Sequence, residues 1–196
     1  MGGKLLENKK LKATRLYEAA YELFTLKGVH ATVVDEIARH AGMAKGTFYL
    51  YCRDKYDLVD KVIIRKTSIL LGRTMKALTE KKEEHPLSFQ ESVVFFVDSL
   101  IQEFLNDTRF LELVFKNLSP ALFERLFRCP ELEDMRQQFI DNFMLGGGTS
   151  ETARQRLYLI VCMVGAVCYG SIIMKMPYGF DNIRPELYRS IERILA

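Results

Sequence analysis

The sequence predicts an all-α protein of about nine helices, in which a small N-terminal helix-turn-helix unit precedes a larger helical domain. Apolar residues recur at helical spacing along most of the chain, and no segment alternates polar and apolar residues as a strand does. Two short helix signals also meet at a tight turn within residues 28–58. We therefore divide the chain into a helix-turn-helix domain, residues 8–68, and a second helical domain, residues 69–196.

The helix-turn-helix prediction depends on cap and turn residues. Thr32 precedes an apolar helical period and Asp35 follows three residues later, which is typical of a capping box with the helix starting at the next residue. Gly42 can adopt the positive φ that ends this helix. A second helix then fits within about residues 43–52, because Asp54 is expected to cap the following one.

The remaining apolar periods predict the rest of the helices. Pro86 and the glycines at 146–148 separate them, and Pro185 is expected at an early position of the last helix. These helices are expected at residues 11–27, 55–80, 88–106, 109–117, 118–127, 131–145, 150–175 and 185–196.

Composition and charge narrow the class of protein. The chain is 48% hydrophobic and 27% charged, as globular proteins are, and its net charge is +3. Residues 1–66 hold thirteen Lys or Arg against eight Asp or Glu, so basic charge gathers beside the helix-turn-helix, as a phosphate-binding surface requires. The four cysteines lack metal-ligand spacing, and residues 1–11 do not read as a leader. We expect no metal, no cofactor and a cytoplasmic location.

Several residues of the first sixty positions stand in a characteristic order and spacing. They are Ala19-Ala20, Leu23-Phe24, Gly28, Thr32, Ile37-Ala38, Ala41-Gly42, Gly46-Thr47-Phe48-Tyr49, Tyr51, Lys55 and Leu58. In this order the chain resembles the tetracycline-repressor (TetR) family of bacterial transcriptional regulators. It departs from the family pattern at Val33, Ala44 and Cys52, where a hydroxyl residue, Ser and Phe are common. Ala44 removes a helix cap and a phosphate donor.

The resemblance implies that the second helix of the motif enters the major groove of double-stranded DNA, where base edges show a distinct donor and acceptor pattern. Lys45 is the best candidate for a guanine edge, and Gly46 permits close approach of the backbone. Hydroxyl groups of the motif and Lys55 are candidates for phosphates or thymine methyl groups. The expected DNA-contacting residues are Thr32, Val33, Ala44, Lys45, Gly46, Thr47, Tyr49, Tyr51 and Lys55.

The stretch Leu157–Met174 contains eighteen residues without a charge. At about 1.5 Å per residue it could just span a membrane, but a helix that is apolar all round can equally be buried against a partner. The resemblance implies that the last two long helices form a twofold homodimer, so we expect no membrane. The expected interface residues are Cys162, Ala166, Gly170, Leu187, Tyr188, Ile191 and Ile194.

Aromatic residues of the second domain suggest a pocket for a small hydrophobic effector. Such an effector would tilt the helix that follows the motif and spread the two recognition helices of a dimer away from a palindromic operator. The same side chains could equally be plain core. The candidate pocket residues are Phe96, Phe104, Phe115, Phe127, Met135, Phe139, Phe143 and Tyr158.

These inferences favour a ligand-responsive, sequence-specific transcriptional repressor. An activator or co-regulator of the same fold fits the same residues, and the apolar helix leaves open a membrane-associated helical interaction protein. An enzyme is not expected, because the three histidines lie near the motif or in a polar linker and Gly146 to Thr149 lacks the lysine of a phosphate-binding loop.

Overall fold

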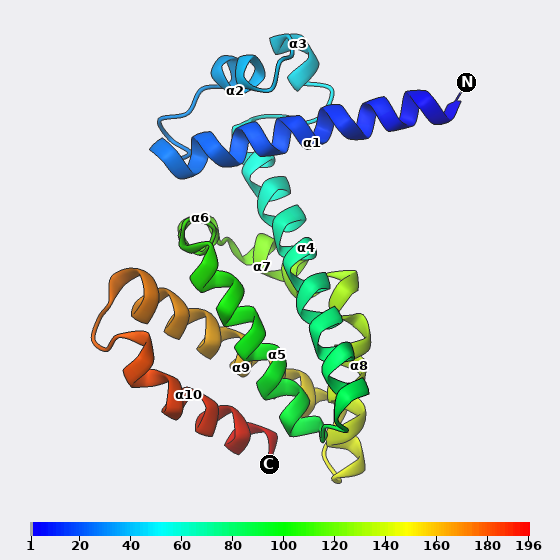
Figure 1. Ribbon diagram of the computed structural model, residues 1–196, viewed down its shortest axis with the longest axis vertical. Coiled ribbons are helices and arrows are strands. Elements are labelled where there is room, and N and C mark those ends of the chain that lie inside the picture. Colours follow the sequence, from blue (N-terminus) through cyan, green and yellow to red (C-terminus); the bar gives the residue numbers. More distant parts are fainter. Residues whose placement is uncertain (1) are drawn as a thin grey trace.

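The computed structural model describes residues 2–196, with side chains from residue 7 onward, and every regular element in this range is a helix (Figure 1). The all-α prediction is confirmed, with ten α-helices where about nine were expected. The elements are α1 (Gly2–Lys27), α2 (Val34–His40), α3 (Lys45–Phe48), α4 (Lys55–Glu84), α5 (Phe89–Asn106), α6 (Thr108–Asn117), α7 (Pro120–Phe127), η1 (Pro130–Leu132), α8 (Glu133–Leu145), α9 (Ser150–Cys168), η2 (Tyr169–Met174) and α10 (Phe180–Leu195).

The helix-turn-helix lies at one end of the molecule and α4 joins it to the other helices. Figure 1 shows α1 crossing beside α2 and α3, while α4 leads from them into the bundle formed by α5 to α10. α4 contains 30 residues, about 45 Å at roughly 1.5 Å per residue. It passes through the predicted boundary at residue 68 without a break, so the two-domain division stays a prediction.

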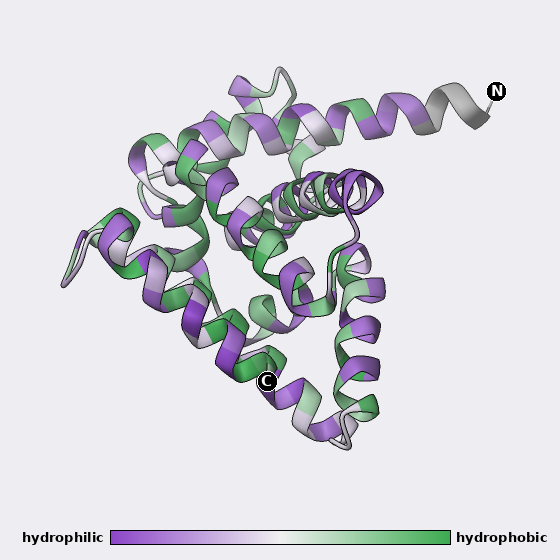
Figure 2. Cartoon of the chain, turned by 60° about the horizontal axis from the view of Figure 1, so that its bottom comes forward, coloured by the Kyte–Doolittle hydropathy of each residue, from purple (hydrophilic) through white to green (hydrophobic). Residues whose placement is uncertain are grey.

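Two groups of buried side chains hold this arrangement. The N-terminal core includes Leu16, Ile37, Phe48 and Leu58 and continues along α4 to Leu78. The C-terminal core joins α5, α6, α8, α9 and α10. Hydrophobic and hydrophilic residues alternate around the helices in Figure 2, as expected for helices that bury one face each. α4 therefore contributes to the same core as the helix-turn-helix, which makes it part of the support of that unit.

The last helix differs from the prediction. It begins at Phe180 after the N-cap Gly179, so Pro185 lies inside the helix rather than near its start. The amides of Asn182 and Ile183 donate to the Gly179 carbonyl at 3.1 and 3.3 Å and close the first turn before the proline is reached. Proline removes one intrahelical hydrogen bond at this point, but it does not prevent the helix.

Two of the four predicted dimer residues on α10 are covered by their own chain in this structure. Leu187 and Ile191 are buried in the C-terminal core of their own chain, and Tyr188 and Ile194 pack against it. The Tyr188 hydroxyl bonds the carboxylate of Asp98 on α5. The apolar period of α10 was real, but periodicity alone does not tell which partner a helix face covers.

The apolar helix near the end of the chain forms as expected and carries a local irregularity. α9 ends at Cys168 and continues as the π-helical segment η2 until Met174, where Lys175 adopts a left-handed conformation with φ 54°. In the described part of the chain this is the one helical stretch long and apolar enough to cross a membrane. Of the residues in its most apolar 18-residue segment, 22% are buried within the chain.

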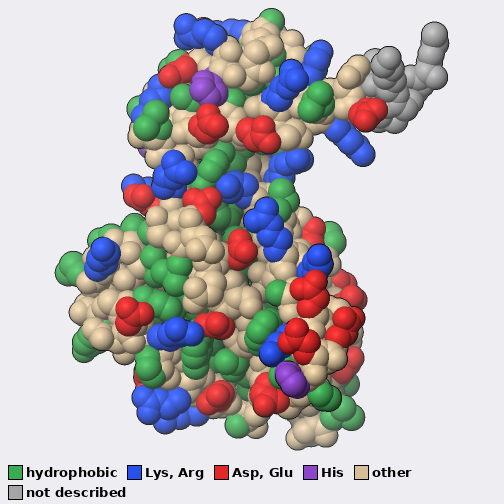
Figure 3. Space-filling view, viewed as in Figure 1, with side chains coloured by type: hydrophobic (Ala, Val, Ile, Leu, Met, Phe, Trp, Pro, Cys, Tyr) green, Lys and Arg blue, Asp and Glu red, His purple; other side chains and the backbone are tan. Residues whose placement is uncertain are grey.

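Charged side chains are unevenly distributed over the face shown in Figure 3. Lys and Arg side chains occur on the part that holds α1 to α3, whereas Asp and Glu gather beside α4 and α8 in the lower body. The two ends of the molecule thus differ in charge on this face, in keeping with the +5 of residues 1–66 and the −2 of the remainder.

The burial of Ile191 predicts that Ile191→Ala lowers the free energy of unfolding by about 3 kcal/mol, because it removes packed methylene groups from a side chain with 0% exposure. Urea unfolding measures this change. The exposed neighbour Glu192→Ala serves as the matched control, and equal stability of the two variants would contradict the assignment of Ile191 to the core.

Candidate nucleic-acid interface

The turn of the helix-turn-helix is held by main-chain hydrogen bonds. The amide of Met43 donates to the Ala38 carbonyl at 2.9 Å, and the amide of Gly42 donates to the Arg39 carbonyl at 3.1 Å. This pair of bonds requires a left-handed residue just after the helix, and Gly42 has φ 66°. The predicted glycine stop is confirmed, and it sets the direction in which α3 leaves α2.

The predicted capping box of α2 is wrong. Its N-cap is Val33, no side chain caps it, and Thr32 is completely buried. The Thr32 hydroxyl donates to the Gly28 carbonyl at 2.8 Å and lies 3.5 Å from the Leu23 carbonyl. Thr32 therefore bonds the end of α1, and in this structure its side chain is not available to a phosphate. Val33 is exposed beside it.

α3 has only four residues and depends on its neighbours for its position. Phe48 has no exposed surface and packs in the N-terminal core with Leu16, Ile37 and Leu58. A helix this short is not stable alone, because helix nucleation is costly. Burial of Phe48 therefore fixes which α3 side chains face outward.

The outward face of α3 is where the sequence placed the base-reading residues. Ala44, Lys45, Gly46 and Tyr49 are exposed, and Thr47 is half-buried. A Cβ atom added to Gly46 would meet nothing within 4 Å, so this part of the surface is open to a large partner. The structure thus brings five predicted contact residues to one exposed surface.

Lys45 is held in place by a carboxylate of the preceding helix. Its ammonium lies 2.8 Å from Asp35 Oδ1, and both side chains are more than half exposed. The hydrogen bond to Asp35 and its negative charge raise the pKa of Lys45. Lys45 therefore provides a positive charge at the start of α3. A hydrogen-bond acceptor of a bound molecule could contact its ammonium group by taking the place of Asp35.

Lys55 and Tyr51 have structural partners that the sequence did not indicate. The Lys55 ammonium donates to the carbonyls of His30 at 2.7 Å and Thr32 at 3.1 Å, which ties α4 to the connection between α1 and α2. An ammonium has three protons, so one remains for a phosphate. Tyr51 is half-buried against the N-terminal core, and its carbonyl accepts from Lys61 at 2.6 Å.

Three exposed residues beside α3 were missed by the sequence analysis. Leu50 is 77% exposed and Tyr56 is 51% exposed, and the Arg53 side chain is exposed with its guanidinium 3.7 Å from Asp57. The sequence analysis named neither Leu50 nor Tyr56, because an apolar or aromatic residue at helical spacing carries no signal for exposure. Arg53 had a signal, because a cation directly before the Asp54 cap lies next to the predicted motif.

The N-terminal unit is joined to the bundle by a polar cluster that we call the Asp107 junction, comprising Tyr21 of α1, Lys66 of α4 and Asp107. The Tyr21 hydroxyl donates to the Asp107 carboxylate at 2.6 and 2.7 Å, and Lys66 donates at 3.2 Å. The Lys66 ammonium also lies 3.6 Å from the centre of the Tyr21 ring. Asp107 in turn caps α6 through the Phe110 amide at 3.1 Å. One carboxylate thus connects three helices.

Protonation of the Asp107 junction follows from its contacts. Burial by itself raises the pKa of Asp107, but the hydrogen bonds from Tyr21, the Phe110 amide and Lys66 outweigh this, so its pKa is lowered. Burial and the hydrogen bond to Asp107 raise the pKa of Tyr21. At neutral pH the carboxyl group of Asp107 is therefore ionised and the phenol of Tyr21 is protonated.

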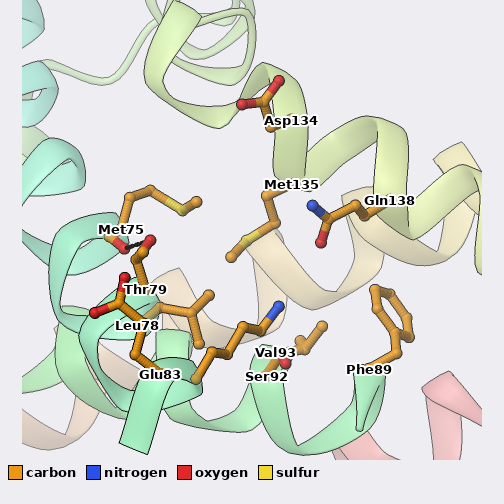
Figure 4. A pocket seen from close by; sticks show the side chains of 11 residues that line it. Met75, Leu78, Thr79, Glu83, Phe89, Ser92, Val93, Asp134, Met135 and Gln138 are labelled. Atoms are coloured by element: carbon orange, nitrogen blue, oxygen red, sulfur yellow. Dashed lines mark hydrogen bonds between the residues drawn. The ribbon is translucent and has the colours of Figure 1, made fainter. Parts of the chain in front are cut away.

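A cavity of about 340 Å³ lies among α4, α5 and α8 in the lower body. Figure 4 shows Met75 and Leu78 of α4, Phe89 and Val93 of α5 and Met135 of α8 around it. Of the eight residues predicted to line a pocket, Met135 lines this one.

The other seven predicted pocket residues contact aromatic neighbours or the cores. Phe96 is buried in the N-terminal core and Phe139 in the C-terminal core. The remaining aromatic contacts are those of Phe104 with Phe110, Phe115 with Tyr169, Phe127 with Phe123, Phe143 with Phe139 and Tyr158 with Phe123.

The described residues contain no group of His, Cys, Asp and Glu that could hold a metal ion. Burial raises the pKa of Cys52 to about 11 and that of Cys168 to about 12, so both thiols are protonated at neutral pH. A reactive thiolate would need the opposite shift.

Comparison with known proteins agrees with the geometry of the N-terminal unit. Residues 16–62 match the model of bacterial regulatory proteins of the tetR family. The chain carries a TetR-family N-terminal domain. The matched range covers the C-terminal part of α1, all of α2 and α3 and the beginning of α4, so it includes the exposed α3 surface and the core beneath it.

Relatives of known sequence match less than half of the chain. A fatty acid metabolism regulator protein of Bacillus subtilis is 32% identical over 76 residues, which are 39% of this chain and 39% of the relative. An uncharacterized helix-turn-helix transcriptional regulator of the same species, YhgD, is 34% identical over 88 residues, 45% of this chain and 41% of the relative. The chain thus spans about two-fifths of the length of these relatives.

Solved structures share the fold over more than nine-tenths of the chain at low identity. FadR of Bacillus halodurans is 19% identical with a TM-score of 0.64, covering 92% of this chain and 94% of that one. FadR of Bacillus subtilis is 16% identical with a TM-score of 0.64, covering 91% and 96%. A TetR-family regulator of Shewanella is 12% identical with a TM-score of 0.65, covering 94% and 95%. The helical body that follows the TetR-family domain therefore has the fold of these regulators.

The lowered pKa of Asp107 gives a pH-dependent prediction. A folded pKa below the unfolded value of about 3.9 means that the carboxylate stabilises the fold above about pH 4 and that this contribution decreases as the pH falls further. Asp107→Asn should cost about 1–2 kcal/mol at pH 7, allowing for partial exposure, and less at pH 3. Urea unfolding of both proteins at the two pH values measures this. A constant difference would contradict the assigned contacts.

Proposed function

We propose that the protein is a ligand-responsive, sequence-specific DNA-binding transcriptional regulator that acts as a homodimer on a palindromic operator. The observation that carries the proposal is the exposed surface of α3, with Lys45, Gly46 and Tyr49 presented to solvent by a helix whose position is fixed by buried Phe48. The TetR-family match over the same residues supports it.

The surface suits a DNA duplex because it combines base-reading and phosphate-binding groups. An α-helix fits the major groove, and a lysine at its first turn can donate to guanine O6 or N7 once it leaves Asp35. The exposed guanidinium of Arg53 and the remaining proton of Lys55 are proposed to bind phosphates, and such contacts fix the register of the helix in the groove. Tyr49 offers a hydroxyl on a rigid stem.

The homodimer is proposed from the exposed part of α9. Tyr158, Val161 and Ala166 are exposed and Cys162 is half-buried, which places an apolar strip along one side of the helix. Small residues at 162, 166 and 170 would let a second helix approach closely. A second copy of the chain would cover this strip, and two copies would present two α3 helices about one helical turn of DNA apart.

The effector is proposed to bind the cavity among α4, α5 and α8. Because α4 also supports the helix-turn-helix, a ligand that binds better when α4 is tilted would move α3 and lower operator affinity. The structure of Bacillus subtilis FadR is a complex with stearoyl-CoA, a ligand with a long apolar chain, which supports a hydrophobic effector here. We propose a repressor released by its effector; an activator would use the same residues.

Other functional classes receive less support. A non-enzymatic role in the cytoplasm agrees with the relatives, which are bacterial regulators. The apolar α9 is the observation that would favour a membrane-associated protein, and a dimeric mass in light scattering without detergent would decide against that alternative.

The DNA contact of α3 predicts that Lys45→Ala weakens operator binding about five- to a hundredfold, since a good base contact contributes about 1–3 kcal/mol. Operator DNA is first selected from a random pool with the native protein, and binding is then measured by fluorescence anisotropy. Lys76→Ala, an exposed lysine at the far end of α4, is the matched control. Unchanged affinity of Lys45→Ala for the selected DNA would refute the assignment of the base contact.

The proposed α9 interface predicts that Ala166→Glu converts the dimer to a monomer, because a charge is then buried against a partner helix. Ala166 is exposed in the single chain, so its unfolding midpoint as a monomer should change little. Sedimentation measures the mass, and Glu192→Ala on the polar side of α10 is the control. A dimer that persists with Glu at 166 would place the interface elsewhere.

A further inference from the structure

The cavity among α4, α5 and α8 is not uniformly apolar. Its interior is formed by Met75, Leu78, Phe89, Val93 and Met135, and methionine side chains adapt their shape to flexible ligands. Its volume of about 340 Å³ lies at the lower end of the range for ligand sites. An apolar chain of medium length fits these properties better than a large rigid ring system.

Lys82 is the single cation among the described residues that line this cavity. Its side chain is half-buried, and it takes part in no ion pair within residues 7–196, for which side chains are described. The neighbouring lysines of α4 are paired, Lys81 with Glu84 at 3.4 Å and Lys76 with Glu80 at 3.7 Å. An ammonium that is partly removed from water and has no carboxylate partner is stabilised when it binds an anionic group of a ligand.

Two carboxylates also line the cavity, but they occupy its edges. Glu83 and Asp134 are both exposed, and Figure 4 shows the Asp134 carboxylate directed away from Met135 and the other apolar side chains. The attraction or repulsion between a ligand and a solvent-exposed charge is weakened by water and salt, whereas a half-buried charge interacts more strongly because its surroundings are less polar. Gln138 adds an amide at the same side as Met135, which can donate to an oxygen atom of a ligand.

We propose that this cavity binds an amphipathic anion, a flexible apolar chain that ends in a carboxylate, with the chain among the Met and Leu side chains and the carboxylate on Lys82. The inference rests on the proposed function in taking this cavity as the effector site, and it adds the charge of the effector and the residue that selects it. Lys82 lies on α4, so the head group of the ligand contacts the helix that supports α3.

Three probes with the same ten-carbon chain separate charge from hydrophobicity: decanoate, decanol and decyltrimethylammonium. Calorimetric titration of the free full-length protein, below the concentration at which each probe forms micelles, should show decanoate binding at least tenfold more tightly than either other probe. Lys82→Met should lower decanoate affinity about tenfold and leave decanol unchanged. Lys82→Glu should reverse the order of decanoate and decyltrimethylammonium.

Two control variants keep the result specific. Lys81→Met removes a lysine of the same turn that is already paired with Glu84, and it should bind decanoate as the native protein does. Val93→Phe fills the cavity and should lose all three probes while its circular dichroism keeps the native helix content. Equal affinity for decanoate and decanol, no effect of Lys82→Met, or no binding of decanoate would each overturn the proposal.

The design distinguishes failure of this inference from failure of the proposed function. Binding of decanoate that depends on Lys82, without any change in affinity for the selected operator, would support the site and overturn the release mechanism. Operator binding by a protein that binds no decanoate would support the DNA-binding function and overturn the assignment of an anionic effector.

Discussion

Burial of the Phe48 side chain is the constraint on which the candidate interface depends. α3 contains one turn of helix and cannot stay folded or oriented by itself. Phe48 is packed among residues of α1, α2 and α4, so each of these helices helps to define the surface of α3. A base-reading surface that small can be specific only because the helices beneath it are held together by one continuous core.

The same core explains why α4 cannot be treated as a passive linker. Its first half closes the N-terminal core with Leu58 and Ile63, and its second half reaches the cavity at Met75 and Lys82. The Asp107 junction lies between these ends and adds a polar contact to α1 and α6. The Asp107 junction therefore opposes a displacement of α4, and a displacement at one end of this helix also changes the position of its other end.

Local patterns predicted the fold well where a short segment contains its own determinants. The glycine stop at Gly42 and the Asp54 cap of α4, which accepts from the amides of Tyr56 and Asp57 at 2.8 Å, needed nothing beyond a few neighbouring residues. The differences from the prediction concern contacts with distant parts of the chain. Thr32 bonds α1 instead of capping α2, and Ile191, which was predicted for a dimer interface, is buried in the core of its own chain, since apolar spacing does not identify what a helix face covers.

In the candidate site, too, the residues of a local motif were predicted and those brought together by packing were not. Exposure of Lys45 and Tyr49 followed from their place in a recognisable motif, whereas the cavity contains mainly residues that the sequence did not single out, because it forms where α8 packs against α4 and α5, and α6 and α7 separate these helices along the chain. One close contact, between α6 and α9, limits how the helices of the body can move. A Cβ atom on Gly165 of α9 would lie 3.3 Å from the Phe115 ring of α6, and that ring stacks on Tyr169 at 4.7 Å. α6 therefore has no space to approach α9, and rearrangement of the body is restricted to rotation of α6 or movement away from this contact.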